Sequence, residues 1–161
     1  MGNELKVTTP SDCEILVTRS FNAPRPLVFE CLSKPEYIRR WLLGPPGWTM
    51  PVCEVDFRVG GKYRYVWRNA DGREMGMGGT FREIVAPERV VSAELFDEDW
   101  TGGETVNTTT LTEHAGKTTL DIRIVYTSKQ ARDGALATGM TEGMSAGFDK
   151  LDALLASLPT H

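Results

Sequence analysis

The hydrophobic pattern of this 161-residue chain changes its period once, and that change limits the folds that it can adopt. From about residue 52 to residue 126, apolar and polar residues alternate, which is the pattern of half-buried β-strands. From about Lys129 to Leu158, apolar residues recur at helical spacing, with Ser128 as the expected N-cap. A sheet followed by one long helix predicts an α+β domain in which the helix covers one face of the sheet.

The alternating part divides into short runs that turn signals separate. The runs cover residues 52–59, 62–68, 74–85, 89–96, 104–113 and 118–126. The turn at 69–72 ends in Asp-Gly, which supplies the positive φ angles of a tight hairpin. Since parallel strands need long crossovers, these runs predict an antiparallel meander.

The first part of the chain predicts one more strand and two short helices. Residues 13–21 form a β-rich run that ends at Asn22-Ala23-Pro24. Helices are expected over 24–32 and 35–42, because a helix tolerates proline in its first turn. We therefore expect a leader of residues 1–12 and then a single domain over residues 13–158, with six to seven strands.

Glycine recurs along the predicted long helix, at Gly134, Gly139, Gly143 and Gly147. Each glycine inside a helix costs about 1 kcal/mol relative to alanine. The last three occur at every fourth residue, so they lie along one line of the helix surface. Two interpretations fit: the sheet approaches the helix closely there, or space is kept open for a ligand. We expect Gly139, Gly143 and Gly147 to shape a cavity.

Large aromatic and thioether side chains recur at every second residue of the predicted strands. A curved sheet that faces such a helix either packs solidly or encloses an apolar pocket, and the glycines favour the pocket. The residues expected to line this pocket and bind a ligand are Trp41, Trp48, Tyr63, Tyr65, Trp67, Met77, Phe81, Met140, Met144 and Phe148.

Composition and motifs argue against several classes of protein. A net charge of −4 with scattered arginines argues against a nucleic-acid binder. The two histidines, His114 and His161, leave little for a metal site or a Ser-His-Asp arrangement, so no catalytic residue, metal or cofactor is predicted. Cys13, Cys31 and Cys53 are expected to be reduced core thiols. Without a signal peptide or an apolar stretch of about 20 residues, a cytoplasmic location is expected.

Two polar features bear on the chemistry of the predicted pocket. Arg58 shares a strand face with Glu54 and Asp56, which indicates a ladder of opposite charges on the outer face of the sheet. If Arg58 points inward instead, it would bind a carboxylate or a polyketide oxygen. The run GMGG at 76–79 indicates a bulge, or clearance for a ligand or the helix. Acid–base chemistry would need a carboxylic acid in apolar surroundings, and the sequence alone identifies none.

Several strings in the chain resemble a known family. They are FNAPRPLVFECLSKPEYIRRWL, VDFRVGGKYRYVW, NADG, GTFREIVAPERVV and GMTEGMSAGFDKLDALLASL, and they span roughly residues 14–158. They are similar to the START and birch-pollen-allergen-like (SRPBCC) superfamily, and within it to bacterial proteins related to the C-terminal domain of the Hsp90 ATPase activator. The resemblance implies a helix-grip fold, in which a curved antiparallel sheet surrounds a long C-terminal helix.

Three classes of function are consistent with these features. The leading interpretation is a protein that binds a small hydrophobic or aromatic molecule in a cavity and catalyses no specific reaction. The first alternative is a cyclase- or hydrolase-like enzyme that acts on a polyketide or aromatic substrate. The second is an interaction module, either a stress-related chaperone accessory or a homodimer formed through a sheet edge or the region of Trp100. Only a dozen residues precede the first predicted strand, so the activator's additional N-terminal domain has no counterpart and chaperone activation is not favoured.

Overall fold

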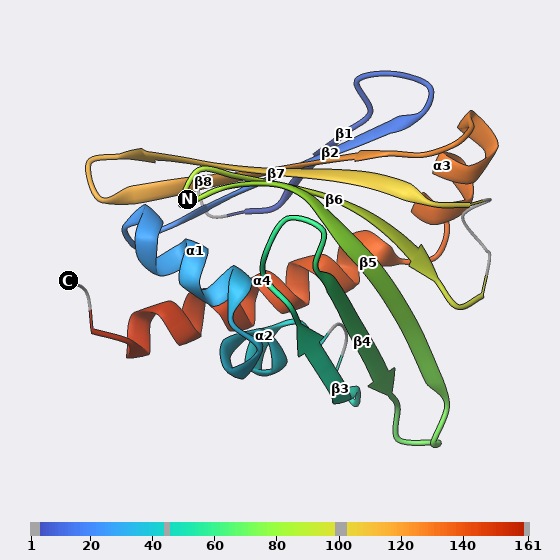
Figure 1. Ribbon diagram of the computed structural model, residues 1–161, viewed down its shortest axis with the longest axis horizontal. Coiled ribbons are helices and arrows are strands. Elements are labelled where there is room, and N and C mark those ends of the chain that lie inside the picture. Colours follow the sequence, from blue (N-terminus) through green and yellow to red (C-terminus); the bar gives the residue numbers. More distant parts are fainter. Residues whose placement is uncertain (1–3, 44–45, 99–102, 160–161) are drawn as a thin grey trace.

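A computed structural model describes residues 4–43, 46–98 and 103–159 of the chain. It contains one antiparallel sheet that curves around the C-terminal helix (Figure 1). The predicted α+β class and the helix-grip arrangement are therefore confirmed. Trp100, one of the positions considered for a dimer contact, lies outside the described residues.

Eight strands form the sheet, one more than the largest number predicted. They are β1 (Lys6–Thr8), β2 (Glu14–Phe21), β3 (Thr49–Val55), β4 (Lys62–Arg68), β5 (Glu74–Val85), β6 (Arg89–Phe96), β7 (Thr105–His114) and β8 (Lys117–Val125). The additional strand, β1, lies in the stretch expected to be a leader. It pairs antiparallel with β2 and places Val7 opposite Val17.

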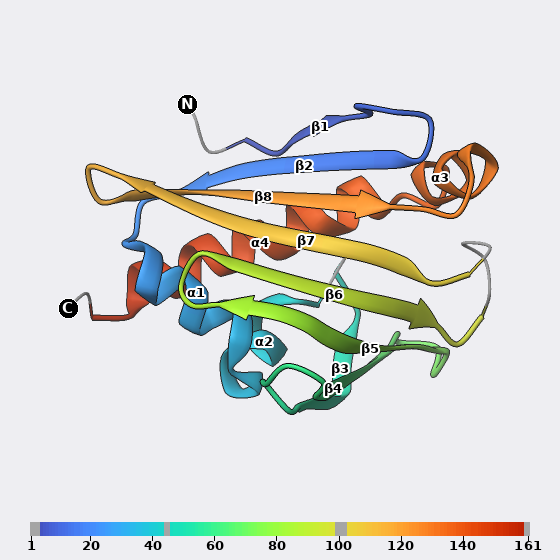
Figure 2. The same cartoon turned by 45° about the horizontal axis from the view of Figure 1, so that its top comes forward.

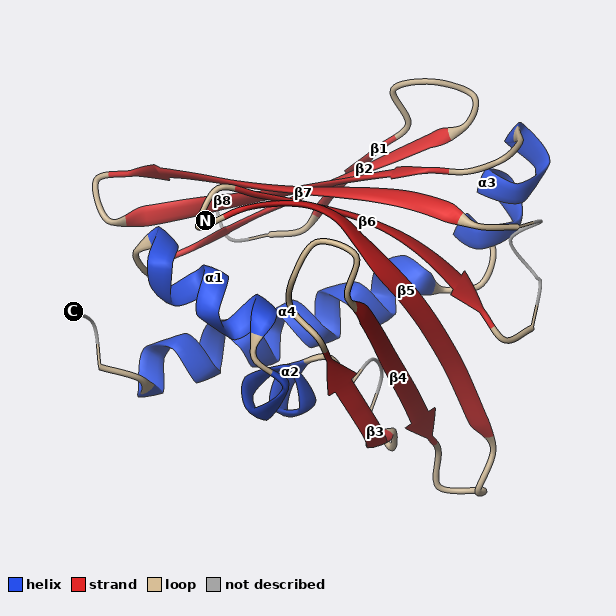
Figure 3. Cartoon of the chain, viewed as in Figure 1, coloured by secondary structure: helices blue, strands red, loops and turns tan. Residues whose placement is uncertain are grey.

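The order of the strands in space follows from the short turns of the chain. It is β1-β2-β8-β7-β6-β5-β4-β3, so β3 to β8 form the predicted meander and β2 joins it by pairing with β8 (Figure 2). The chain must therefore cross the sheet between β2 and β3. Two helices make this crossing, α1 (Arg25–Ser33) and α2 (Pro35–Trp41), and they lie on the same side of the sheet as the C-terminal helix (Figure 3).

The C-terminal helix is interrupted, and the prediction of one continuous helix over residues 129–158 is wrong. α3 (Lys129–Leu136) ends before Gly139, and α4 (Met140–Ser157) begins after it. Gly139 has a φ of 81°, in the left-handed region that glycine adopts without the steric cost of a side chain. This glycine therefore marks the break between the two helices.

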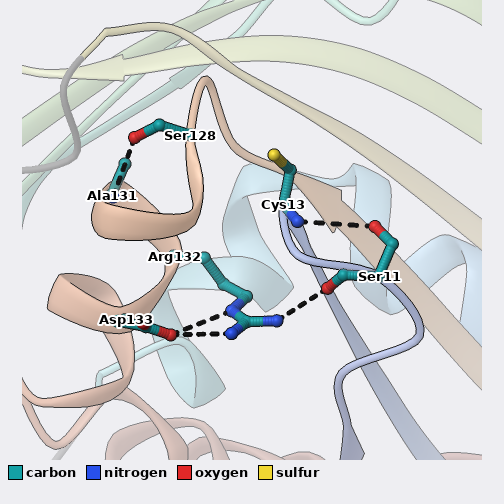
Figure 4. Close-up of polar contacts among 6 residues, drawn as sticks. All are labelled: Ser11, Cys13, Ser128, Ala131, Arg132 and Asp133. Carbon is teal, nitrogen blue, oxygen red and sulfur yellow. Dashed lines mark hydrogen bonds and ion pairs between the residues drawn. The ribbon is translucent and has the colours of Figure 1, made fainter.

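The start of α3 confirms the N-cap expected at Ser128. Ser128 Oγ accepts a hydrogen bond of 3.0 Å from the backbone N–H of Ala131 (Figure 4). This bond satisfies one of the N–H groups that the first turn of a helix leaves unpaired. In the same region, Arg132 donates a hydrogen bond of 2.6 Å to the carbonyl oxygen of Ser11, which ties α3 to the loop between β1 and β2.

The interior contains two groups of buried apolar side chains. The first lies between α4 and strands β2 and β8, where Ile15, Leu120 and Leu151 are fully buried. The second lies between α2 and strands β3 to β5 and includes Tyr65 and Trp67. A cavity lies where the two groups meet, since residues from both of them line it.

Candidate functional site

A cavity of about 340 Å³ lies between the sheet and the helices α1, α2 and α4. Sites for small molecules begin at roughly 300 Å³, so this cavity has the size of a small ligand site. Most of its lining side chains are apolar or aromatic. They come from strands β4 to β8 as well as from the three helices.

Nine of the ten residues predicted to bind a ligand line this cavity. They are Trp41, Tyr63, Tyr65, Trp67, Met77, Phe81, Met140, Met144 and Phe148. The tenth, Trp48, is not part of the lining and packs against the second apolar group instead. The period-two pattern thus placed the large side chains of β4 and β5 on the inner face of the sheet.

The glycines expected to shape the cavity act in a different way. None of Gly139, Gly143 and Gly147 is a lining residue. A Cβ atom at Gly147 would lie 3.2 Å from the carbonyl oxygen of Trp41, so this glycine permits α4 to approach α2 closely. The Trp41 ring then stacks on Phe148 at a centroid distance of 5.7 Å, and both rings face the cavity. Close approach, to α2 and not to the sheet, explains Gly147.

One row of paired residues crosses four strands and positions the polar groups of the cavity. Tyr63 on β4 pairs with Gly79 on β5, Gly79 pairs with Glu94 on β6, and Glu94 pairs with Thr105 on β7. The ring of Tyr63 lies across Gly79, where a Cβ atom would collide with it. Because Gly79 has no side chain, the Tyr63 hydroxyl group reaches over β5 to Glu94.

This hydroxyl group is part of a buried polar cluster formed by Tyr63, Ser92, Glu94 and Asn107. The Tyr63 hydroxyl donates to Glu94 Oε2 at 2.9 Å, and its oxygen also lies within hydrogen-bond distance of Ser92 Oγ, at 3.1 Å. The Asn107 side chain hydrogen-bonds to Glu94 as well. In the described part of the chain, no lysine or arginine forms an ion pair with Glu94, so only uncharged groups hold its carboxyl.

One acceptor of the polar cluster has no hydrogen-bond donor beside it. Asn107 Oδ1 is buried and accepts no hydrogen bond from any residue that the structure describes. Asn107 lies opposite Ser92 in the register of β6 and β7, so it belongs to the row next to that of Glu94. An unsatisfied buried acceptor costs about 1–3 kcal/mol, which is a large cost at a single side chain.

The surroundings of the polar cluster favour uncharged forms of its ionisable groups. Burial raises the pKa of Glu94, and the hydrogen bonds from Tyr63 and Asn107 offset this only in part. Burial, with the nearby Glu94 carboxylate as a second cause, raises the pKa of Tyr126 to about 12 and raises the pKa of Tyr63. A carboxyl group with a raised pKa in an apolar cavity is typical of acid–base sites.

The charge ladder expected on a strand face is not formed, because β3 ends at Val55 and both Asp56 and Arg58 lie in the loop that follows it. Arg58 Nε lies 2.9 Å from Asp56 Oδ2, both side chains are exposed, and Arg58 does not line the cavity. Gly76 of the GMGG run leaves room for the ion pair between Arg64 and Asp97. Gly76 and Gly79 therefore leave clearance for side chains of the sheet and not for a ligand or the helix, and the bulge of β5 lies beyond the run, between Phe81 and Glu83.

The sequence alone missed Glu94 and Ser92 as residues of the site. They lie on β6 between Val90 and Phe96, and all four side chains line the cavity. The information that could have found them lies in the strand pairing. An inward-facing Tyr63 with a glycine opposite it on the neighbouring strand predicts that the tyrosine side chain reaches the strand beyond. That prediction needs the register of three strands, which the sequence pattern does not determine.

Two general features of the described residues complete the description. No three of their histidine, cysteine, aspartate or glutamate side chains are grouped as metal ligands. None of the described helices is both long enough and apolar enough to cross a membrane.

Comparison with protein families gives a match over most of the chain. The family model described as "Activator of Hsp90 ATPase homolog 1-like protein" matches residues 22–156. This stretch contains both helices of the crossover, the meander, α3 and most of α4. No curated protein matches the sequence at a significant level.

Solved structures of bacterial proteins resemble this fold along almost its whole length. A crystal structure of a protein from Rhodobacter sphaeroides is 32% identical, with a TM-score of 0.91 over 97% of this chain and 100% of that one. A protein from Mycobacterium smegmatis is 26% identical, with a TM-score of 0.84 over 97% and 98% of the two chains. A protein from Chromobacterium violaceum is 27% identical, with a TM-score of 0.73 over 88% and 96%.

Proposed function

The chain belongs to the family of Activator of Hsp90 ATPase homolog 1-like proteins, and on that premise we propose that it binds a small hydrophobic or aromatic molecule in the cavity beneath α4. Proteins of this family commonly bind hydrophobic ligands. The observation that carries the proposal is the cavity of about 340 Å³ with its aromatic lining. An apolar ligand there would remove apolar surface from water, at about 25 cal/mol for each Å² buried.

Two neighbouring valines provide a matched test of the site. Val90 lines the cavity, and the side chain of Val91 points to the opposite face because side chains alternate along a strand. We expect Val90→Phe to fill part of the cavity and to weaken ligand binding at least about tenfold, which corresponds to about 1.4 kcal/mol. Val91→Phe adds the same volume on the outer face and should bind like the wild type.

The measurement is a titration with a panel of apolar ligands, followed by tryptophan fluorescence and by calorimetry. Trp41 and Trp67 line the cavity, so a bound ligand should change the emission of both. If no ligand of the panel binds to the wild-type protein, the proposal fails. If the Val90→Phe and Val91→Phe variants bind equally well, the ligand occupies another site.

The polar cluster favours a second candidate function, a cyclase- or hydrolase-like enzyme acting on a polyketide or aromatic substrate. Such an enzyme requires an ionisable group that faces the cavity, and Glu94 is such a group. A carboxyl group whose pKa is raised by burial is suited to exchange a proton with a bound substrate. Under this hypothesis, Glu94→Gln abolishes turnover of a converted ligand but preserves its binding. Full turnover by that variant would contradict it.

The third class of function, an interaction module, has less support in the structure. Docking on a chaperone or a second copy needs a large exposed apolar patch. The large apolar side chains that are exposed among the described residues are Val59, Met75, Val85, Leu95 and Val125. The four that lie on strands have other residues as their register partners, so no two of them face each other across a strand pair. The cavity is therefore the better supported location for the proposed function.

A further inference from the structure

The polar cluster contains more hydrogen-bond acceptors than donors, and this imbalance limits what can bind beside it. The Tyr63 hydroxyl has one proton, which it can give to Glu94 Oε2, and the Ser92 hydroxyl can donate its own proton to the Tyr63 oxygen. The Asn107 amide supplies a further donor to Glu94, while its own Oδ1 is buried without a donor.

Among the residues that the structure describes, no positive charge compensates for this excess of acceptors. The one arginine of the cavity lining is Arg89, at the other end of β6. Glu94 lies five positions farther along the strand, or about 17 Å away, and Arg89 Nε donates to Glu83 Oε1 at 2.7 Å. The Glu94 carboxyl has hydrogen-bond partners in Tyr63 and Asn107, and its charge helps to raise the pKa of Tyr126.

We propose that the ligand of this cavity is an aromatic or alicyclic compound with one hydrogen-bond donor, a hydroxyl or N–H group, that docks at Glu94 and Asn107. The inference rests on the proposed binding function and deepens it. The apolar body of the ligand lies among the aromatic side chains, and its donor provides the proton that the cluster lacks. A buried acceptor left without a partner rejects an analogue that has no donor, which makes such a site selective.

A series of naphthalenes of similar shape separates the donor from the apolar body. 2-Naphthol has a donor, 2-methylnaphthalene has a group of the same size without polarity, and 2-methoxynaphthalene can only accept. The quantity to compare is the ratio of the Kd of 2-methylnaphthalene to that of 2-naphthol, measured by calorimetry. Because each ratio is taken within one protein and then compared between proteins, the intrinsic hydrophobicity of the ligands cancels.

The variants change the acceptor at one position of the cavity wall, Glu94. Glu94→Leu has no acceptor, and the Tyr63 hydroxyl keeps Ser92 Oγ as its partner at 3.1 Å. Glu94→Gln keeps the shape and one acceptor, so it reports on the site if the leucine variant does not fold. Glu54→Gln, on an exposed position of β3, is the control.

We expect the ratio to fall about tenfold in Glu94→Leu, the effect of one hydrogen bond to a buried acceptor. It should fall less in Glu94→Gln and stay unchanged in Glu54→Gln. An equal ratio in the wild type and in Glu94→Leu would overturn the inference. Tighter binding of 2-methoxynaphthalene than of 2-naphthol would overturn it as well. Neither result would contradict the proposed binding function. If none of the three compounds binds to the wild type, both the inference and the binding of aromatic ligands fail.

Discussion

Two ionisable side chains project from the inner face of the same sheet, Arg19 on β2 and Glu94 on β6, and only one has an opposite charge beside it. Arg19 is 3% exposed, and its Nη1 lies 3.0 Å from Asp149 Oδ1. Its Nη2 lies 3.6 Å from Asp152 Oδ2. Glu94 lines the cavity and has hydrogen-bond partners without a formal charge.

The difference shows which of the two groups serves the fold. Asp149 and Asp152 belong to α4, so their ion pairs with Arg19 fix the C-terminal half of that helix to β2. The N-terminal half of α4 contributes Met140 and Met144 to the cavity that Glu94 lines. A buried charge is tolerated when the protein supplies its partner. Where the protein supplies none, a proton or a ligand completes the site.

The largest effect is expected from removing the carboxylates that compensate for Arg19. The double variant Asp149→Asn and Asp152→Asn leaves a guanidinium group buried without an anion. We expect a loss of about 3 kcal/mol in the free energy of unfolding, the lower end of the range for a broken buried pair, because solvent reaches both carboxylates. Urea denaturation measures it.

The control for the Arg19 ion pairs is Glu83→Gln, which breaks the exposed ion pair with Arg89. Both of these side chains are close to half exposed, so this change should cost less than about 1 kcal/mol. An equal loss in the two variants would mean that burial does not distinguish Arg19. In that case the comparison with Glu94 would lose its physical basis.

A smaller effect is expected at Gly79, which lets Tyr63 reach Glu94. Gly79→Ala places a Cβ atom against the Tyr63 ring, and overpacking of this kind costs about 1–3 kcal/mol. The neighbouring Gly78→Ala is the control, because the nearest atom to its Cβ would be the Tyr63 carbonyl oxygen at an ordinary 3.6 Å.

The displaced ring should also change binding, because Tyr63 donates to the Glu94 carboxyl. Calorimetry should show weaker binding of 2-naphthol to Gly79→Ala than to Gly78→Ala. A double-mutant cycle with Tyr63→Ala then isolates the contact, since removing the ring should make Gly79→Ala nearly harmless. If Gly79→Ala still lowers the free energy of unfolding when the Tyr63 ring is absent, the backbone at Gly79 and not the ring causes the loss.

The sequence predicts this fold well because turn chemistry marks the ends of its strands. β5 and β6 begin and end at the predicted residues, since Ala86-Pro87-Glu88 interrupts both patterns. β1 was missed because three residues in a polar stretch have no detectable period. The break at Gly139 was missed for a different reason: its spacing is the same as that of Gly143 and Gly147. Only the backbone angle distinguishes a glycine that ends a helix from one that packs within it.

The polar part of the site was harder to predict than its aromatic part. On β4, large side chains alternate with charged ones, so Tyr63 and Tyr65 could be placed on the inner face. On β6 both faces carry apolar residues, and Val91 and Leu95 lie on the face opposite to Glu94. An alternating pattern of apolar and polar residues would place Glu94 on the solvent side of the strand. Only the register of the paired strands shows that it faces the cavity. The residue that gives the cavity its polarity therefore looks like a surface residue in the sequence.

The smallest effect is expected in the pH dependence of stability. The pKa of folded Glu94 lies above its ordinary value of 4.5 because burial disfavours the carboxylate. As pH rises from about 4.5 through the folded pKa, the folded protein holds more protons than the unfolded chain, so the free energy of unfolding falls. Glu94→Gln cannot ionise, and it should gain stability relative to the wild type over this interval.

Asp97→Asn provides a contrast of opposite sign. The hydrogen bond from Arg64 lowers the pKa of Asp97 below its ordinary value of 3.8, so this carboxylate contributes stability that is lost as pH falls through its folded pKa. The advantage of wild type over Asp97→Asn should therefore shrink in acid, whereas its disadvantage against Glu94→Gln should grow toward neutral pH. Urea denaturation at several pH values measures both differences. A pH-independent difference between Glu94→Gln and wild type would show that Glu94 is already compensated, and the contrast with Arg19 would disappear.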